Sequence, residues 1–149
     1  MTEPAQLIRV PALSDVAEYA YAATVVPPAR LVFTAGACPL DADGRTVAPG
    51  DPVGQARQVM ANLETALAAA GARLTDVVRT TVYVASSRQA DLVAAWEVVR
   101  DAFGDHEPPS TLLGVTVLGY PEQLVEVEAV AAVKAVAAVE VEAVARDGN

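Results

Sequence analysis

The spacing of apolar and polar positions predicts two amphipathic helices. The first begins after Asp51, which can cap it, has Pro52 at the first helical position, and ends at Gly71. Its apolar stripe consists of Ala56, Met60, Leu63, Leu67 and Ala70. The second helix is expected to begin near Ser87 and to stop at Gly104. Its apolar face consists of Leu92, Trp96, Val99 and Phe103.

Strand patterns account for most of the remaining chain. Runs rich in β-branched, aromatic and other apolar residues occupy positions 7–12, 19–26, 31–34, 77–85, 111–118 and 124–133. The resulting order, β-β-β-α-β-α-β-β, predicts an α+β domain with a single mixed β-sheet and two helices on one face. The other face would then lack a cover in a monomer. Because an uncovered apolar sheet face usually meets a partner, we expect an oligomer.

The C-terminal segment repeats part of the last predicted strand. The sequence at positions 125–131, VEVEAVA, recurs at positions 139–145. We therefore divide the chain into one domain over residues 1–135 and an extension over residues 136–149. Duplication of the last strand would give an appended strand or helix, and the alternative is an arm that reaches a neighbouring subunit. The alanine content favours a helix, whereas the Val-Glu alternation favours a strand, so the sequence leaves both open.

Composition and charge narrow the function. The net charge is −9, and the ten cationic residues are scattered along the chain, so nucleic acid and anionic membranes are poor partners. One His and one Cys cannot form a zinc site of His and thiolate ligands, and no acidic cluster indicates another metal. Cys38 is the only cysteine, and no targeting or membrane-spanning run is evident, so we expect a cytoplasmic protein without metal or cofactor.

Several segments together resemble the Rid superfamily (YjgF/YER057c/UK114, RidA-like). They are Leu31–Gly36, Pro39–Asp41, Gln55–Gln58, Asn62–Leu63, Ala69–Gly71, Asp76–Val84, Trp96–Glu97, Pro108–Pro109 and Val125–Ala129. The resemblance covers residues 15–133 and implies a chorismate-mutase-like fold, a homotrimer and small-molecule clefts between subunits. In the best-known branch, these clefts hydrolyse reactive enamines and imines to a keto acid and ammonia.

The resemblance also assigns site residues. The family's water-positioning Glu falls on Glu126, which makes this residue the candidate catalytic group. The family's pocket Tyr falls on Tyr19, or on Tyr21 if the register shifts. Its Ser-Gly-Gln turn falls on Ala35 to Ala37, which retains Gly36. The remaining candidate substrate-binding residues are Cys38, Ser110 and Thr111.

At three positions, this chain lacks the polar or charged residue of the family pattern. Ser110 stands where the family has an Arg that clamps the substrate carboxylate, Ala35 replaces a Ser, and Val93 replaces an Asn. No Arg or Lys occurs from Asp101 to Val133, so a small shift in register does not restore the clamp. The chain thus looks like a branch that lacks the catalytic Arg, and 2-aminoacrylate is a doubtful substrate.

Glu126 and Glu128 share one face of the predicted last strand with apolar residues. A carboxyl group on such a face can act as a general acid or base. The leading hypothesis is therefore an enzyme that acts on an imine, enamine or related carbonyl compound by water or proton transfer. The alternative is a non-catalytic trimer that binds a ligand or a partner protein. A ribonuclease is disfavoured by the acidic charge.

Overall fold

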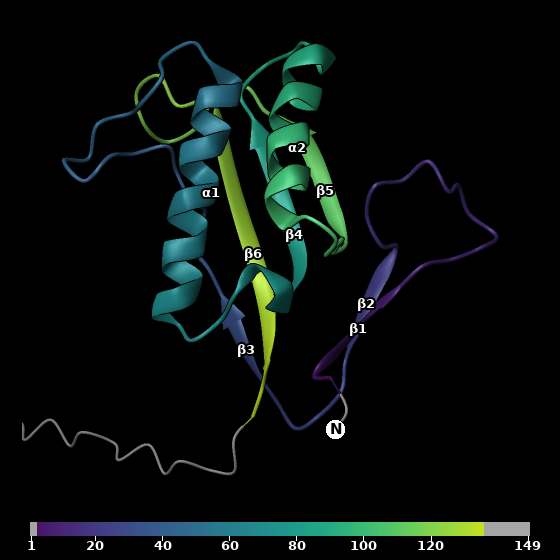
Figure 1. Cartoon of the computed structure of the whole chain (residues 1–149). Coiled ribbons are helices and arrows are strands. Elements are labelled where there is room, and N and C mark those ends of the chain that lie inside the picture. Colours follow the sequence, from purple (N-terminus) through teal and green to yellow (C-terminus); the bar gives the residue numbers. More distant parts are fainter. Residues whose placement is uncertain (1–2, 136–149) are drawn as a thin grey trace, which may run out of the picture.

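The computed structural model describes residues 3–135 and follows the predicted order of elements (Figure 1). A short 3-10 helix, Leu74–Asp76, leads into β4. The strands and helices are β1 (Ala5–Ile8), β2 (Ala22–Val25), β3 (Ala29–Phe33), α1 (Pro52–Ala69), β4 (Val77–Val84), α2 (Gln89–Phe103), β5 (Ser110–Gly114) and β6 (Val125–Lys134). The repeated segment at 136–149 lies outside the described residues.

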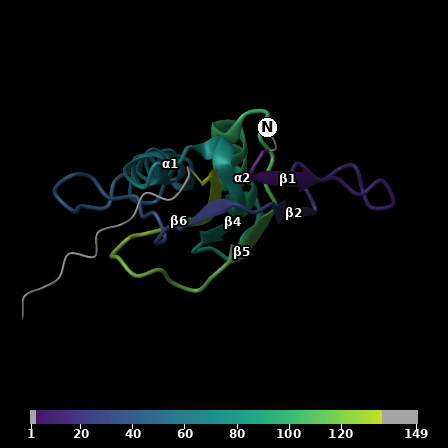
Figure 2. The same cartoon turned by 90° about the horizontal axis from the view of Figure 1, so that it is seen from below.

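The main sheet is mixed, as predicted, and has the strand order β3-β6-β4-β5. β4 and β5 are parallel, whereas β6 is antiparallel to both β3 and β4. One detail differs from the single sheet that we expected. β1 and β2 pair with each other in a separate two-stranded sheet, which lies to one side of the main sheet in Figure 2. The alternation of residue types predicts strands but not which neighbour each strand pairs with.

Both helices cover the same face of the main sheet (Figures 1 and 2). The core between the layers contains alternate residues of β6, including Val125 and Val127, and the predicted stripe of α1. Glu126, Glu128 and Val130 of β6 therefore point to the opposite face, because strand side chains alternate. This open face also carries Phe33, whose side chain is 72% exposed.

The helices and strands begin and end near the predicted residues, with three differences. α1 begins at Pro52, but the side chain of Asp51 makes no capping hydrogen bond, so its predicted capping role is wrong. Gly71 and Gly104 have φ of +77° and +62°, the conformation that ends a helix and suits glycine. β1 and β2 are shorter than predicted. β5 ends at Gly114, because β4 ends at Val84 and offers no partner farther along.

Two further properties concern the described part of the chain. None of its helices is long and apolar enough to cross a bilayer. Residues 3–135 also contain no group of three or more His, Cys, Asp or Glu side chains arranged to hold a metal ion.

Candidate functional site

Glu126 is placed by β6 and by the segment that follows β3. Residues 34–38 run beside β6, and Ala37 exchanges backbone hydrogen bonds of 2.7 and 3.2 Å with Val127. Thr34 is likewise bonded to Ala129, through both its backbone amide and its hydroxyl. The pairing brings Gly36 against the side chain of Glu126. A Cβ atom on Gly36 would lie 2.5 Å from both Cδ and Oε2 of Glu126, so only glycine leaves room for this carboxylate.

One oxygen of the Glu126 carboxylate is held by two donors. The Cys38 thiol donates to Oε1 over 3.1 Å, and the Gln123 amide donates to the same oxygen over 3.2 Å. Within residues 3–135, no donor is found on Oε2. The carboxylate is therefore oriented through Oε1, while Oε2 can still accept a proton or a hydrogen bond.

Helix α1 fixes both loops that supply these donors. The Asn62 amide donates to the carbonyl oxygens of Cys38 and Leu40 at 2.8 and 2.9 Å. The Gln55 side chain is fully buried; it donates to the Glu122 carbonyl and accepts from the Leu124 amide. Because a buried amide needs its hydrogen bonds, these two side chains tie the loops to the helix rather than to solvent.

The Cys38 thiol is protonated at neutral pH. Desolvation by burial, followed by the hydrogen bond to Glu126 and the charge of that carboxylate, raises the pKa of Cys38 to about 11. A nucleophilic cysteine needs the opposite environment, with a cation that stabilises the thiolate. Cys38 is therefore a hydrogen-bond donor to Glu126 and not a nucleophile.

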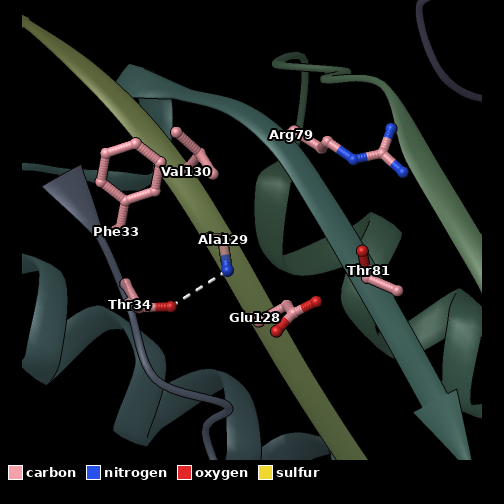
Figure 3. Close-up of a pocket in the computed structure, with 7 residues that line it drawn as sticks. All are labelled: Phe33, Thr34, Arg79, Thr81, Glu128, Ala129 and Val130. Carbon is pink, nitrogen blue, oxygen red and sulfur yellow. Dashed lines mark hydrogen bonds between the residues drawn. The ribbon is translucent and has the colours of Figure 1, made fainter. Parts of the chain in front are cut away.

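A cavity of about 250 Å³ opens on the same sheet face as Glu126, next to Glu128, which is two residues farther along β6 (Figure 3). It is lined by Phe33, Thr34, Arg79, Thr81, Glu128, Ala129 and Val130. The Tyr83 hydroxyl donates to Glu128 over 2.7 Å, and this bond is the main reason that the pKa of Tyr83 is raised. Arg79 donates to the Thr111 hydroxyl over 3.1 Å. β4 thus supplies a cation to the face that carries the two glutamates.

A second cavity, of about 430 Å³, lies at the β5 edge of the sheet and is lined by Tyr19, Trp96, Ser110, Thr111 and Leu112. The rings of Tyr19 and Trp96 meet edge to face, with centroids 6.1 Å apart. The Ser110 hydroxyl accepts a 2.6 Å hydrogen bond from Thr80, which is almost fully buried. Three predicted substrate-binding residues, Tyr19, Ser110 and Thr111, therefore share this cavity.

The cation next to Ser110 is already engaged. Arg100 of α2 donates from Nη1 to both carboxylate oxygens of Glu18 at 2.9 and 3.0 Å, and it contacts Asp101 through Nε and Nη2. Trp96 also donates to Glu18, over 3.0 Å. The hydrogen bond from Trp96, and to a smaller extent those from Arg100, lower the pKa of Glu18. Because Arg100 is occupied by two carboxylates, it does not replace a substrate-clamping Arg at Ser110.

The predicted site residues thus form two groups within one chain. Gly36 and Cys38 adjoin Glu126 on the open face. Ser110 pairs in register with Thr80, and Glu126 pairs with Tyr83. Side chains alternate along a strand, so Thr80 and Tyr83, which are three residues apart on β4, point to opposite faces of the sheet. Their register partners, Ser110 and Glu126, therefore lie on opposite faces as well.

Two predicted residues lie outside both groups. The side chain of Ala35 is exposed. The Tyr21 hydroxyl donates to the Ser14 carbonyl, in a third hollow between the 9–18 loop and Glu107. Sequence reasoning also missed Gln123 and Arg79. Nothing in the residues around Gln123 indicates its partner. Arg79 could have been found, because it is four residues from Tyr83 on β4 and therefore points to the same sheet face.

Comparisons with known proteins agree with this architecture. Residues 12–133 match the family described as Endoribonuclease L-PSP. A RutC family protein of Pyrococcus horikoshii is 34% identical over 102 residues, which cover 68% of this chain and 79% of that protein. The solved structure of the Rid family protein YyfB from Yersinia pestis is 30% identical and covers 86% of this chain and 98% of its own, with a TM-score of 0.79.

A third relative was solved with a ligand. The structure of TdcF from E. coli with bound serine is 27% identical, covers 78% of this chain and 88% of its own, and has a TM-score of 0.62. The family match spans most of the chain, and both helices and the mixed sheet agree with the solved relatives. The chain therefore belongs to the Rid (YjgF/YER057c/UK114) superfamily.

Proposed function

We propose that this protein is a small-molecule enzyme that hydrolyses an imine, an enamine or a related carbonyl compound in clefts between the subunits of a homotrimer. The observation that carries the proposal is the oriented carboxylate of Glu126. Cys38 and Gln123 hold Oε1, and Oε2 is available at the Gly36 turn. A carboxylate held in one orientation can position a water molecule and accept its proton.

The proposed reaction needs only water. As the water oxygen forms a bond to the imine carbon, Glu126 accepts one water proton, and the C=N electron pair moves to nitrogen. The proton then passes to the nitrogen, which gives a carbinolamine. Glu126 next relays the hydroxyl proton to the same nitrogen, so the C=O bond forms as the C–N bond breaks, and ammonia and a carbonyl product are released. An enamine enters the same sequence after protonation at carbon. None of these steps requires a redox cofactor.

Assembly would join the two groups of site residues. Glu126 and Ser110 lie on opposite faces of one sheet, so a complete site that used both would need a second subunit. The exposed apolar side chains of the open face, including Leu31 at 45% and Phe33 at 72%, support association through this side of the molecule. The relative with bound serine supports a small polar ligand.

The substrate should carry less negative charge than 2-aminoacrylate. Ser110 is hydrogen-bonded to Thr80 and provides no cation, and the nearby Arg100 is saturated by Glu18 and Asp101. A planar guanidinium that binds a carboxylate through two hydrogen bonds is hard to replace with a hydroxyl. The pocket with Tyr19 and Trp96 is better suited to a neutral or weakly charged group.

Two other functions are less well supported. The family description names an endoribonuclease, but a net charge of −9 opposes binding of an RNA backbone. A non-catalytic binding trimer would explain the cavities, yet it gives no role to the two donors that orient Glu126.

The deciding experiment measures ammonia release from a panel of imines and enamines generated in solution. Wild type should turn over at least one neutral member, and Glu126→Gln should lose that activity while remaining folded. Glu64→Gln, on the exposed side of α1, is the matched control and should behave as wild type. Equal turnover by wild type and Glu126→Gln would overturn the proposed mechanism. No turnover across the panel would favour the binding trimer.

A further inference from the structure

The cavity at the β5 edge has an aromatic wall of defined shape. Tyr19, from the segment between β1 and β2, and Trp96 of α2 both line it, and their rings meet at 84° with centroids 6.1 Å apart. Two rings at nearly a right angle form a corner. A flat ring placed in this corner can stack on one ring and meet the other edge to face, and these are the two arrangements that aromatic pairs prefer.

Neighbouring side chains hold both rings in place. The Trp96 indole N–H donates to Glu18 over 3.0 Å, and Glu18 is in turn held by Arg100. The Tyr19 ring packs edge to face against the ring of Tyr21, whose hydroxyl donates to a backbone carbonyl of the preceding loop. Because the corner already exists without a ligand, little side-chain ordering is needed on binding, which favours a ligand of matching shape.

The polar groups of the cavity are neutral. The Ser110 hydroxyl accepts from Thr80 and the Thr111 hydroxyl accepts from Arg79, so each keeps its own proton for donation. None of the described residues that line the cavity is charged. The cavity therefore suits a neutral acceptor, such as an imine nitrogen or a carbonyl oxygen, next to the aromatic corner.

The cavity lies away from the subunit contact that we assign to the open face. The exposed residues of that contact, Leu31 and Phe33, belong to β3, and β3 and β5 are the two opposite edges of the main sheet. The volume of about 430 Å³ is within the range of about 300–1,000 Å³ typical of small-molecule sites. Tyr19, Trp96 and Ser110 are half-buried, so a ligand can reach them.

We propose that this cavity binds the ring of the substrate, and that the substrate is a neutral imine with an aromatic ring next to its C=N bond. The ring lies in the corner of Tyr19 and Trp96, and the imine nitrogen accepts from the Ser110 hydroxyl. This inference rests on the proposed function, because it names the substrate class of the same cleft. Hydrolysis of such an imine consumes one water molecule and releases ammonia and an aromatic ketone or aldehyde, so no further reactant is needed.

Binding is measured with benzamide, a neutral aromatic amide whose carbonyl oxygen can accept from Ser110. Trp96 is the single tryptophan, so its fluorescence reports binding, and calorimetry gives the affinity. Cyclohexanecarboxamide has a puckered ring and should bind at least about threefold more weakly, because it loses the aromatic contacts. Benzoate should bind at least about tenfold more weakly, because its charge would have no partner in the cavity. Absence of benzamide binding, or equal or tighter binding of either comparison compound, would overturn the proposal.

Variants of Tyr19 test the corner while keeping Trp96 as the reporter. Tyr19→Leu should weaken benzamide binding at least about threefold, because one aromatic wall is lost. Tyr19→Phe keeps the ring and should recover most of that affinity, which separates loss of the ring from a disturbance of the loop. Tyr120→Leu removes an exposed tyrosine that does not line the cavity and is the matched control. Unchanged affinity in Tyr19→Leu would contradict the proposed corner.

Turnover distinguishes this inference from the proposed function. The ketimine of acetophenone should show a kcat/KM at least about threefold above that of the ketimine of cyclohexyl methyl ketone, because only the first keeps the aromatic contacts. Turnover of both at equal rates would overturn the substrate class and leave the proposed function intact. Benzamide binding without turnover of any imine would instead overturn the proposed function and leave the ring-binding cavity in place.

Discussion

The Cys38 thiol and the Glu126 carboxylate are 3.1 Å apart, although 88 positions separate them in the sequence. The contact joins the loop after β3 to the last strand. Through this contact, the Cys38 thiol donates a hydrogen bond that orients the candidate catalytic carboxylate. Burial, and then the hydrogen bond to the carboxylate and its charge, raise the pKa of Cys38 and so keep the thiol protonated.

This relationship predicts a slow and pH-dependent reaction of Cys38 with iodoacetamide. The alkylation rate should rise with a midpoint near pH 11. Glu126→Gln should shift the midpoint down, because the negative charge is lost, but not as far as 9.0, because desolvation is the larger cause. Mass spectrometry measures the reaction cleanly because the chain has one cysteine. A midpoint at or below 9.0 in the wild type would contradict the described environment.

The same shift links the thiol to stability. Its folded pKa of about 11 exceeds the reference value of 9.0, so folding favours the protonated form. That contribution is fully present below pH 9.0 and is lost as the pH rises to about 11. The free energy of unfolding of wild type should therefore fall over this window more steeply than that of Cys38→Ser, whose hydroxyl does not titrate there. Parallel urea titrations of both proteins measure the difference.

Gly36→Ala should disable the candidate site with little effect on the fold. The added methyl group would lie 2.5 Å from the Glu126 carboxylate, which must move and lose its alignment with Cys38 and Gln123. We expect turnover to fall at least tenfold, since displacing a catalytic group by about 1 Å can cost on the order of 100-fold. Gly119→Ala is the matched control, because no atom lies within 4 Å of its added Cβ. Unchanged turnover in Gly36→Ala would remove the case for Glu126.

The sequence predicted the elements because their signals are local. The apolar stripe of α1, Pro52 at its first turn and Gly71 after it depend only on spacing and backbone preference. The alternation of β6 likewise placed Glu126 and Glu128 on one face. Pairing between strands depends on distant segments, which is why the separate β1–β2 sheet was not predicted.

The site was only partly predictable for the same reason. The donors on Glu126 come from two loops, and α1 fixes those loops through buried amides that resemble ordinary polar residues in the sequence. The sequence also showed no cation near Glu126, yet Arg79 reaches the same face from a neighbouring strand. The family resemblance named Glu126 and Ser110 but could not reveal that they lie on opposite faces of the sheet.

Acid should release the contact between Glu18 and Trp96. The hydrogen bonds from Trp96 and Arg100 lower the pKa of Glu18 below its ordinary value of 4.5. The contact therefore contributes stability that is present above pH 4.5 and is lost as the pH falls through the lower, folded-state pKa. The fluorescence of Trp96, the single tryptophan, should change only below pH 4.5.

Glu18→Gln tests the assignment of that transition. The amide does not titrate, so the fluorescence change should disappear. Glu97→Gln, which alters an exposed carboxylate next to Trp96 in the sequence, should retain it. A transition that survives in Glu18→Gln would mean that another group controls the environment of the indole.

The protein should run as a trimer in solution, with a light-scattering mass three times the 15.4 kDa of one chain. Phe33→Lys should weaken the assembly, because it places a charge on the exposed apolar part of the open face. Val16 is even more exposed, at 82%, but lies in the loop between β1 and β2, so Val16→Lys should leave the mass unchanged. A monomer mass for the wild type would remove the clefts between subunits from the proposed function.

Hydrolysis of 2-aminoacrylate should be slow in the wild type. The loss of a charge-assisted clamp for the carboxylate costs on the order of 2–5 kcal/mol, or about 30-fold and upward relative to relatives that carry the Arg. Ammonia release from enzymatically generated 2-aminoacrylate gives the rate. A rate equal to that of an Arg-bearing relative would show that another group binds the carboxylate.

Ser110→Arg should recover only part of that activity. Ser110, Arg100 and Glu18 line the same narrow pocket, so the new guanidinium would lie near the Glu18 carboxylate, which can compete with a substrate carboxylate for it. It would also leave the buried Thr80 hydroxyl without its acceptor. Combining Ser110→Arg with Glu18→Gln removes the competing carboxylate, so the double variant should be faster than Ser110→Arg alone. If the single variant already reaches the full rate, the neighbouring carboxylate and the changes at Ala35 and Val93 do not limit this chemistry.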